Sequence, residues 1–349
     1  MRCLEESFLD RQFVYLTIHK NGRAVGLAVV TQEHFDLGIF LPDKATRICE
    51  HLRKIVPGLM TLRLAMVGTF ETTKKHWWFN EHDLSEEQFV DHLLKAAETA
   101  FPSAKLLIVR DFMAGNVEDQ ALERTFLKRG FRSVSNLPLA TIRLDGLNLG
   151  QHFARLKSKS KTTIRKALRA MEKKQLRLAR VSEFRDLIDE CYPLYLQVHQ
   201  HAVEFKRAPI PKRFFHSFAD QLSNKSSILT VRDEKGHLLA FMLTGTSESV
   251  NSPFLIGMDY SYSRELPLYY VLLWNEIAYA ADRGCREVDM GVTSYFVKQT
   301  MGASLEQMDM AIRTQPRWLR PLVNPLLPLL SEKQPQKRRL FRQPETEES

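Results

Sequence analysis

The chain has 349 residues, a formal net charge of +9, and 44% hydrophobic and 26% charged residues, which is typical of a soluble globular protein of about two domains. Four scattered cysteines without a CxxC pair argue against a disulfide framework and a zinc motif, and no apolar run reaches the ~18 residues of a membrane-spanning helix. Because the first residues do not resemble a signal peptide, we expect a cytoplasmic protein with reduced, buried thiols.

The first half of the chain predicts a hairpin, a strand, a helix and a strand. Lys20 to Arg23 form the hairpin turn, since Asn-Gly between apolar runs is a strong hairpin signal. Ser85 is expected to cap the helix, because Glu86, Glu87 and Gln88 follow it. The predicted ranges are 13–19 and 24–30 for the hairpin, 60–70 for the strand, 85–101 for the helix and 105–111 for the last strand.

The second half repeats the same order of elements, which predicts an internal duplication. A Lys-Gly turn at 234–237 again joins two apolar runs, and Gly284 is expected to end the helix. The predicted ranges are 227–233 and 238–244 for the hairpin, 253–260 for the strand, 266–283 for the helix and 287–292 for the last strand; two further helices are expected at 183–205 and 212–222.

A basic segment at 155–180 lies between the halves. It holds eleven Lys or Arg and one acid, Glu172, so the remainder of the chain is close to neutral. A local cationic helix favours an anion such as a phosphate, an anionic polymer or a lipid surface. A solvated helix face or an interdomain connector is an equally open interpretation.

The sequence divides into three parts. We expect an N-terminal domain at 1–146, a C-terminal domain at 147–313 that opens with the basic segment, and a tail at 314–349. Four prolines between Pro316 and Pro328 exclude one long helix in the tail, and its end is expected to be disordered. The apolar part of the tail either packs on the C-terminal domain or contacts an anionic membrane.

Particular motifs of the second half carry a resemblance to a known group. They are the Lys/Arg-rich run 157–169, Asp259 and Tyr260 at a strand end, the helix start 266–273, and 289–291 followed by Tyr295, Lys298 and Gly302. They resemble the BioF2-like and FemAB-like tandem GNAT transferases of bacteria, the peptidoglycan-biosynthesis type. The resemblance implies an α/β (α+β) fold of two tandem GNAT-like domains, with mixed sheets flanked by helices and a degenerate first domain that serves mainly as scaffold.

The chain departs from the common GNAT pattern in its phosphate loop. A run of alternating Arg or Gln with Gly usually precedes the long helix, whereas 261–267 has one Arg and no Gly. The resemblance and the start of the helix instead suggest that Arg264, Tyr269, Tyr270 and Lys298 bind the phosphates of a donor. Arg264 can equally be a surface residue beside Glu265.

The catalytic candidates are Asp259, Tyr260 and Lys298. Asp259 can accept a proton from the acceptor amine or cap the turn after its strand. Tyr260 can donate to a leaving group or simply pack. Lys298, expected in a loop after a strand, faces the donor or the oxyanion by resemblance.

Residues expected to bind substrate are His201, Glu204, Arg165 and Asp289. His201 and Glu204 can share a helix face, whereas His199 and His201 point to different faces, so no metal site is expected. Asp289 inside a short apolar strand can equally be a structural ion-pair partner.

The sequence leaves three functions open. The first is an N-acyltransferase that moves an acyl group from acyl-CoA or an acyl carrier protein to an amine, with acyl-CoA as co-substrate and no tightly bound cofactor. The second is a FemAB-like transferase that uses aminoacyl-tRNA on a cell-wall precursor, with the basic helix on RNA phosphates. The third is a non-catalytic adaptor for nucleic acid or the inner membrane face.

Overall fold

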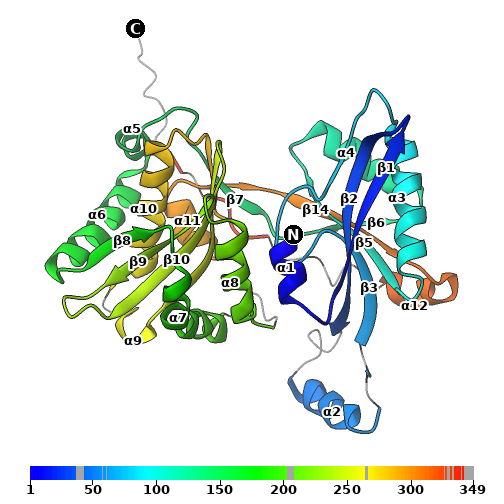
Figure 1. Cartoon of the computed structure of the whole chain (residues 1–349), viewed down its shortest axis with the longest axis horizontal. Coiled ribbons are helices and arrows are strands. Elements are labelled where there is room, and N and C mark those ends of the chain that lie inside the picture. The colour runs from blue at the N-terminus through cyan, green and yellow to red at the C-terminus, as the bar shows by residue number, and fades with distance from the viewer. Residues whose placement is uncertain are drawn as a thin grey trace. The chain divides into compact units, whose positions relative to one another are not determined.

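The computed structural model describes residues 1–36, 43–56, 58–59, 61–202, 208–263, 266–325, 327, 331, 334–338 and 340–341. The described chain divides into two compact units (Figure 1). Unit 1 comprises Met1–Phe8, Pro138–Glu306 and the segment from Gln334, and unit 2 comprises Leu9–Leu137 and Gln307–Lys333.

Unit 2 is built on a mixed sheet. Among the described residues its strand order is β1-β2-β3-β5-β14-β6, with β4 paired to β2. The β1–β2 hairpin is antiparallel, whereas β3 and β5 run parallel because a helix connects them. The strands are β1 Gln12–Lys20, β2 Arg23–Asp36, β3 Thr61–Val67, β4 Trp77–Phe79, β5 Leu106–Met113, β6 Arg132–Ser135 and β14 Met308–Thr314.

Both faces of the unit 2 sheet are covered. Leu93 of α3 and Phe126 of α4 belong to a core with Val67 and Val109 of the sheet. A second cluster joins Met66 and Ile108 to Leu327, near α12. The helices are α2 Asp43–Arg53, α3 Glu86–Ala100, α4 Val117–Lys128 and α12 Arg320–Val323, with a 3-10 turn at Arg317–Leu319. Ser85 and Gln88 form the predicted capping box of α3.

Unit 1 holds the second mixed sheet. Its described strand order is β13-β7-β12-β11-β10-β9-β8, and β11 and β12 are the parallel pair. The strands are β7 Leu139–Arg143, β8 Arg177–Val181, β9 Ser226–Arg232, β10 Leu238–Thr246, β11 Val250–Met258, β12 Glu287–Asp289 and β13 Ser304–Glu306.

Helices pack on this sheet through aromatic and aliphatic side chains. Tyr195 of α7 and Phe215 of α8 contact each other, and Phe215 contacts Phe241 of β10. On α10, Leu272 and Ile277 are fully buried. The helices are α1 Arg2–Ser7, α5 Leu149–Arg155, α6 Ser158–Lys173, α7 Ile188–His201, α8 Lys212–Gln221, α9 Tyr260–Ser263, α10 Leu268–Asp282 and α11 Tyr295–Thr300, with a 3-10 turn at Arg185–Leu187.

Each sheet includes one strand from the other half of the sequence. β14 lies between β5 and β6 and is antiparallel to both. In the same way, β7 lies between β12 and β13 and is antiparallel to both. The chain therefore passes between the units more than once, which the expected ranges 1–146, 147–313 and 314–349 do not describe.

The predicted hairpins, the strands and helices that follow them and the basic helix are all present, and the cysteines are buried and free of disulfides. The tail differs from expectation. Leu327 packs in the core of unit 2, not on the C-terminal domain, because Val323 and Leu327 cover apolar sheet residues. The end of the tail is expected to be disordered, yet the backbone amide of Arg338 donates to Gln299 Oε1 of α11 at 2.7 Å. Residues 342–349 lie outside the described range.

Candidate active site

The strands β11 and β12 part after a short parallel pairing. Val250 and Asn251 of β11 pair with Glu287 and Val288. β11 then continues to Met258 along β10, while β12 ends at Asp289 beside β7. Pro253 has no backbone N–H, so it cannot donate to a sheet ladder at this position. Beyond Asn251, β11 pairs with β10 alone, and we call this point of the sheet the wedge. Backbone groups at such a point can bind a ligand.

Buried polar groups fix the point where the strands part. Asn251 donates through Nδ2 to Glu276 Oε2 of α10 at 2.9 Å, and Arg180 of β8 donates to Glu276 Oε1 at 2.8 Å. Arg180 also lies over the ring of Tyr279, 3.8 Å from its centroid. Glu276 is fully buried, and these donors balance its charge. The network ties α10 to the base of the wedge.

Asp259 and Tyr260 lie directly after β11, as predicted. The Ser261 amide and hydroxyl donate to Asp259 Oδ1 at 2.9 and 2.6 Å, which is the turn-capping arrangement. Tyr260 stacks on His201 with ring centroids 4.1 Å apart, and its amide donates to Gln197 Oε1. Burial raises the pKa of Tyr260, so its phenol remains protonated at neutral pH. The structure therefore brings two predicted site residues, Tyr260 and His201, together.

Lys298 lies in α11, so its expected position in a loop is wrong. It is 4% exposed, and its Nζ donates to the Val292 carbonyl at 2.6 Å. Between them, Thr293 and Ser294 have φ angles of 66° and 49°. Left-handed non-glycine residues store strain and are enriched at functional sites. The ammonium thus holds the loop that connects β12 to α11.

The start of α10 lies beside α11. Tyr270 shares a hydrogen bond with Thr300 of α11, and burial raises the pKa of its phenol. The first turn of α10, which includes Tyr269, carries no acidic residue, so the helix dipole is available to an anion there. Arg264 and Glu204, both predicted for the site, lie outside the described residues.

Helix α6 carries a cationic stripe, which we define as Lys159, Arg165, Lys166, Arg169 and Lys173. All five are exposed. At about 100° per residue these five positions fall within an arc of about 120° around the helix axis, and the buried Ile164 and Ala167 face the other way. Arg165 lies 5.1 Å from the ring centroid of Phe153, a residue of α5. α6 itself packs against α10.

Asp289 caps the turn after β12. Its Oδ1 accepts a hydrogen bond from the Gly291 amide at 3.0 Å.

Within the described ranges, no group of three His, Cys, Asp or Glu side chains is arranged to hold a metal ion. In the same part of the chain, no helix combines the length and apolar character needed to cross a membrane.

The corresponding strand ends of unit 2 hold a buried polar network. Asp111 follows the parallel part of β5 with a φ of 64°, and Asn136 donates to its Oδ1 at 2.9 Å. Arg110 lies 3.3 Å from the same oxygen, and His76 Nε2 lies 4.0 Å from Oδ2. Burial raises the pKa of Asp111 and lowers that of His76 to about 4. None of these four residues is among the site residues predicted from the sequence.

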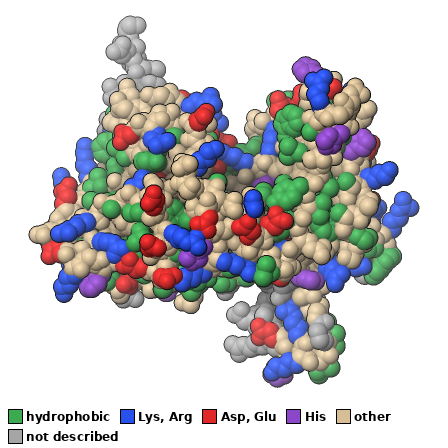
Figure 2. Space-filling view, viewed as in Figure 1, with side chains coloured by type: hydrophobic (Ala, Val, Ile, Leu, Met, Phe, Trp, Pro, Cys, Tyr) green, Lys and Arg blue, Asp and Glu red, His purple; other side chains and the backbone are tan. Residues whose placement is uncertain are grey.

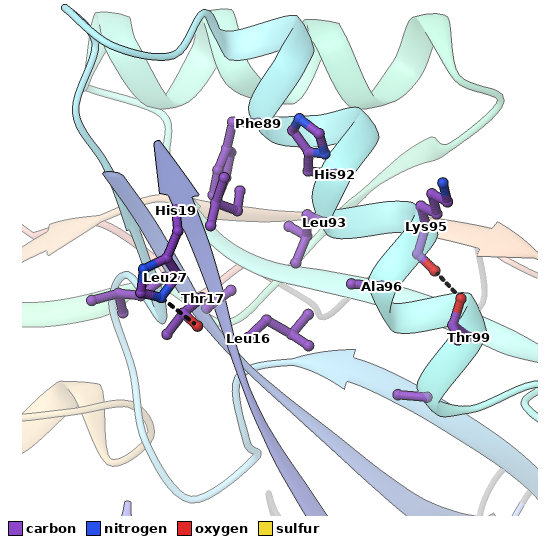
Figure 3. Close-up of a pocket in the computed structure, with 13 residues that line it drawn as sticks. Leu16, Thr17, His19, Leu27, Phe89, His92, Leu93, Lys95, Ala96 and Thr99 are labelled. Carbon is purple, nitrogen blue, oxygen red and sulfur yellow. Dashed lines mark hydrogen bonds between the residues drawn. The ribbon is translucent and has the colours of Figure 1, made fainter. Parts of the chain in front are cut away.

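Unit 2 also contains two cavities that no predicted site residue lines. One, of about 590 Å³, lies between β1, β2 and α3, with Leu16, Leu27 and Phe89 on its walls (Figure 3). The other, of about 570 Å³, is lined by Trp77, Trp78 and several carboxylates. Of the two adjacent tryptophans, Trp77 is buried and Trp78 is half exposed.

The sequence of residues 158–299 matches the acetyltransferase (GNAT) domain family. The chain carries a GNAT domain. This domain covers the parting strands, α10 and Lys298, and it makes the protein a GNAT-fold acyltransferase, a transferase enzyme. No curated protein matches the chain by sequence.

Solved structures share the tandem GNAT fold over nearly the whole chain. FemX has a TM-score of 0.60 at 12% identity and covers 93% of both chains. L-PGS from Bacillus licheniformis has a TM-score of 0.54 at 14% identity and covers 95% of this chain and 96% of its own. A tandem GNAT protein from the clavulanic acid pathway has a TM-score of 0.53 at 11% identity, covering 88% and 84%. At these identities the likeness establishes the fold.

Three polar residues of the GNAT domain are not among the predicted site residues. Asn251, Glu276 and Arg180 connect the wedge to α10 and β8. One signal was present: Glu276 stands within a run of apolar residues in 271–280, and a carboxylate on an apolar helix face usually has a buried partner.

Proposed function

We propose that the protein transfers an aminoacyl group from an aminoacyl-tRNA to an amine. The observation that carries this is the cationic stripe on α6, the helix that packs against α10. From Lys159 to Lys173 the stripe spans about 20 Å at 1.5 Å per residue. That length suits a row of phosphates along a nucleic-acid backbone, whereas a pyrophosphate would engage one or two of these side chains.

The loop before α10 supports the same donor. The segment 261–267 lacks the glycines that let backbone amides surround the pyrophosphate of CoA in the common GNAT pattern. A donor held by its polynucleotide does not need such a loop. The FemAB-like resemblance of the second half also implies aminoacyl-tRNA as donor.

The reaction exchanges an ester for an amide. The acceptor amine attacks the aminoacyl carbonyl, the bond to the tRNA ribose oxygen breaks, and the amine proton leaves. In our proposal Asp259 receives that proton, Lys298 stabilises the oxyanion, and the protonated phenol of Tyr260 donates to the ribose oxygen. His201 positions Tyr260 through the ring stack. Asp289 supports the adjoining turn.

Acyl transfer from acyl-CoA is the second candidate. The family match to a GNAT domain and the α10 N-terminus, free of acidic residues in its first turn, favour it. Tyr269 and Tyr270 would then lie near the donor phosphates. An acyl-CoA that raises the melting temperature of the protein would support this candidate over the first.

The test combines transfer with salt dependence. We expect the protein to form an amide product from aminoacyl-tRNA, and its tRNA affinity to fall steeply with salt. Replacing Lys159, Lys166 and Lys173 by Gln removes three exposed charges from the stripe. This should reduce the slope of log affinity against log salt by about 2 to 3, since each phosphate contact contributes about 0.7 to 0.9.

The matched control replaces three exposed lysines of unit 2, Lys95, Lys105 and Lys128, by Gln. It changes net charge equally and should leave the slope near that of the natural protein. An equal loss in both variants would mean non-specific attraction and would contradict the proposal. Transfer from acyl-CoA without transfer from aminoacyl-tRNA would establish the second candidate instead.

A further inference from the structure

Helix α2 of unit 2 carries an exposed apolar face. The helix lies between β2 and β3 in the chain and projects away from the sheet of its unit (Figure 1). Four large apolar side chains on or directly after it remain open to solvent: Ile48 is 62% exposed, Leu52 46%, Ile55 78% and Val56 53%. Single exposed apolar residues are common on protein surfaces, but four in nine residues form a patch.

These four residues lie on one side of the helix. The amides of Ile55 and Val56 donate to the Leu52 carbonyl, so the helical turn continues past Arg53. Positions 48, 52, 55 and 56 then follow the i, i+4, i+7, i+8 pattern of an amphipathic helix. Glu50, two residues from Leu52, points to the other side. Within 48–56, the described side chains at the centre of the apolar side carry no charge.

His51 and Arg53 border the apolar face on its two sides. His51 is exposed, and Arg53 donates from Nε to the Leu59 carbonyl at 2.9 Å, whereas the exposed Lys54 lies nearer the side of Glu50. Across 43–56 the sequence has four Lys or Arg and two acids. Figure 2 shows Lys or Arg side chains on the projecting part of unit 2 that holds α2, together with hydrophobic, His and acidic side chains.

We propose that residues 48–56 dock on the surface of an anionic lipid bilayer. The apolar side chains enter the boundary between headgroups and acyl chains, and the basic side chains meet anionic headgroups. Charge complementarity selects this occupant: an apolar face with cations at its border fits an anionic surface, whereas an interface between two copies would bring the cations of both copies together. The inference is independent of the acyl donor.

Cosedimentation of the full chain with vesicles tests the proposal. We expect binding to vesicles of phosphatidylcholine mixed with phosphatidylglycerol, and weaker binding to phosphatidylcholine alone. The double variant Ile48→Glu, Ile55→Glu should lose about tenfold or more in partition coefficient, because it places carboxylates in the apolar face. Both side chains are exposed, so the fold should survive, as thermal melting would check.

Two controls separate this surface from others. The double variant Leu9→Glu, Val117→Glu makes the same chemical change at residues that are each 77% exposed elsewhere in unit 2, and it should bind vesicles like the natural protein. Trp318→Glu tests the tail and should change binding less than the α2 variant. Failure of the natural protein to bind mixed vesicles would overturn the proposal. So would unchanged binding of the α2 variant, or self-association without lipid binding that the α2 variant abolishes.

Discussion

The parallel strand pair of unit 1 and that of unit 2 follow the same order of elements but end differently. In unit 1, β11 and β12 pair at two positions and then part. In unit 2, β3 and β5 pair from Leu64 to Val67, and a buried Arg-Asp-His network lies beyond them. Arg110 and Asp111 of unit 2 are buried, and Asn136 donates to one carboxylate oxygen of Asp111, whereas Tyr260 and Asp259 of unit 1 remain partly exposed. The same order of elements can thus form a partly exposed candidate reaction site in unit 1 and a buried structural network in unit 2.

The largest effect is expected on stability, at the buried Arg110–Asp111 pair of unit 2. Arg110→Met removes the cation beside the buried carboxylate of Asp111, and breaking a buried pair costs about 3–5 kcal/mol. Calorimetry should show this loss, while transfer activity per folded molecule stays unchanged. Adding Asp111→Asn should recover part of the stability, and Arg124→Met, at an exposed position of α4, should have little effect. A lost activity with natural stability would contradict the assigned support role.

Acidification should weaken the same network. His76 stays neutral in the folded protein down to a pKa of about 4, whereas the unfolded chain takes up the proton near 6.5. The free energy of unfolding therefore falls as pH falls from 6.5 to 4, by about 3 kcal/mol from this group. Asp111, whose pKa is raised, acts in the opposite direction. Denaturant melts across this range should show a flatter pH dependence for His76→Gln than for the natural protein; equal slopes would refute the assignment.

In unit 1, Lys298→Met should reduce the single-turnover rate of transfer about 100-fold, which is the effect of removing one oxyanion donor. KM should change little, because the lost interaction acts in the transition state. Lys225→Met, at an exposed position of unit 1, is the control. If Lys298→Met lowers only the melting temperature, the ammonium holds the 292–294 loop and does not take part in transfer.

The smallest effect is expected at the stack on Tyr260. His201→Ala removes a ring contact of about 0.5–1.5 kcal/mol from an exposed position. We expect a loss of about two- to tenfold in kcat/KM for transfer, with a normal melting temperature. His201→Phe, which can keep the stack, should restore most of the activity. A loss above 100-fold in the first variant would instead indicate proton transfer by the imidazole.

Local signals predicted the elements well. The Asn-Gly turn, the capping box at Ser85 and the apolar runs depend on neighbours in sequence, so β1, β2, α3 and β5 were all expected. The positions of Asp259 and Tyr260 after a strand followed from the same reasoning. The first-half network was missed because burial of Asp111 and His76 depends on residues far apart in the chain.

Two features had no local signal. The segments of β7 and β14 can be read as strands, but nothing in them identifies the sheet that accepts them. Lys298 lies in α11 and not in the expected loop, because left-handed conformations at Thr293 and Ser294 shorten the connection and let α11 begin at Tyr295. Residues with those side chains adopt such conformations only where the surrounding structure imposes them.

The exchanged strands have a consequence for biosynthesis. As the nascent chain emerges, β5 and β6 are made long before β14, so their facing backbone groups wait for a partner that arrives late in translation. A chain truncated before residue 308 would leave β5 and β6 with unpaired backbone N–H and C=O groups. Such strand edges can pair with other chains and lead to aggregation. The sheet of unit 2, whose first strands are synthesised first, is therefore completed only when β14 has been made near the end of translation.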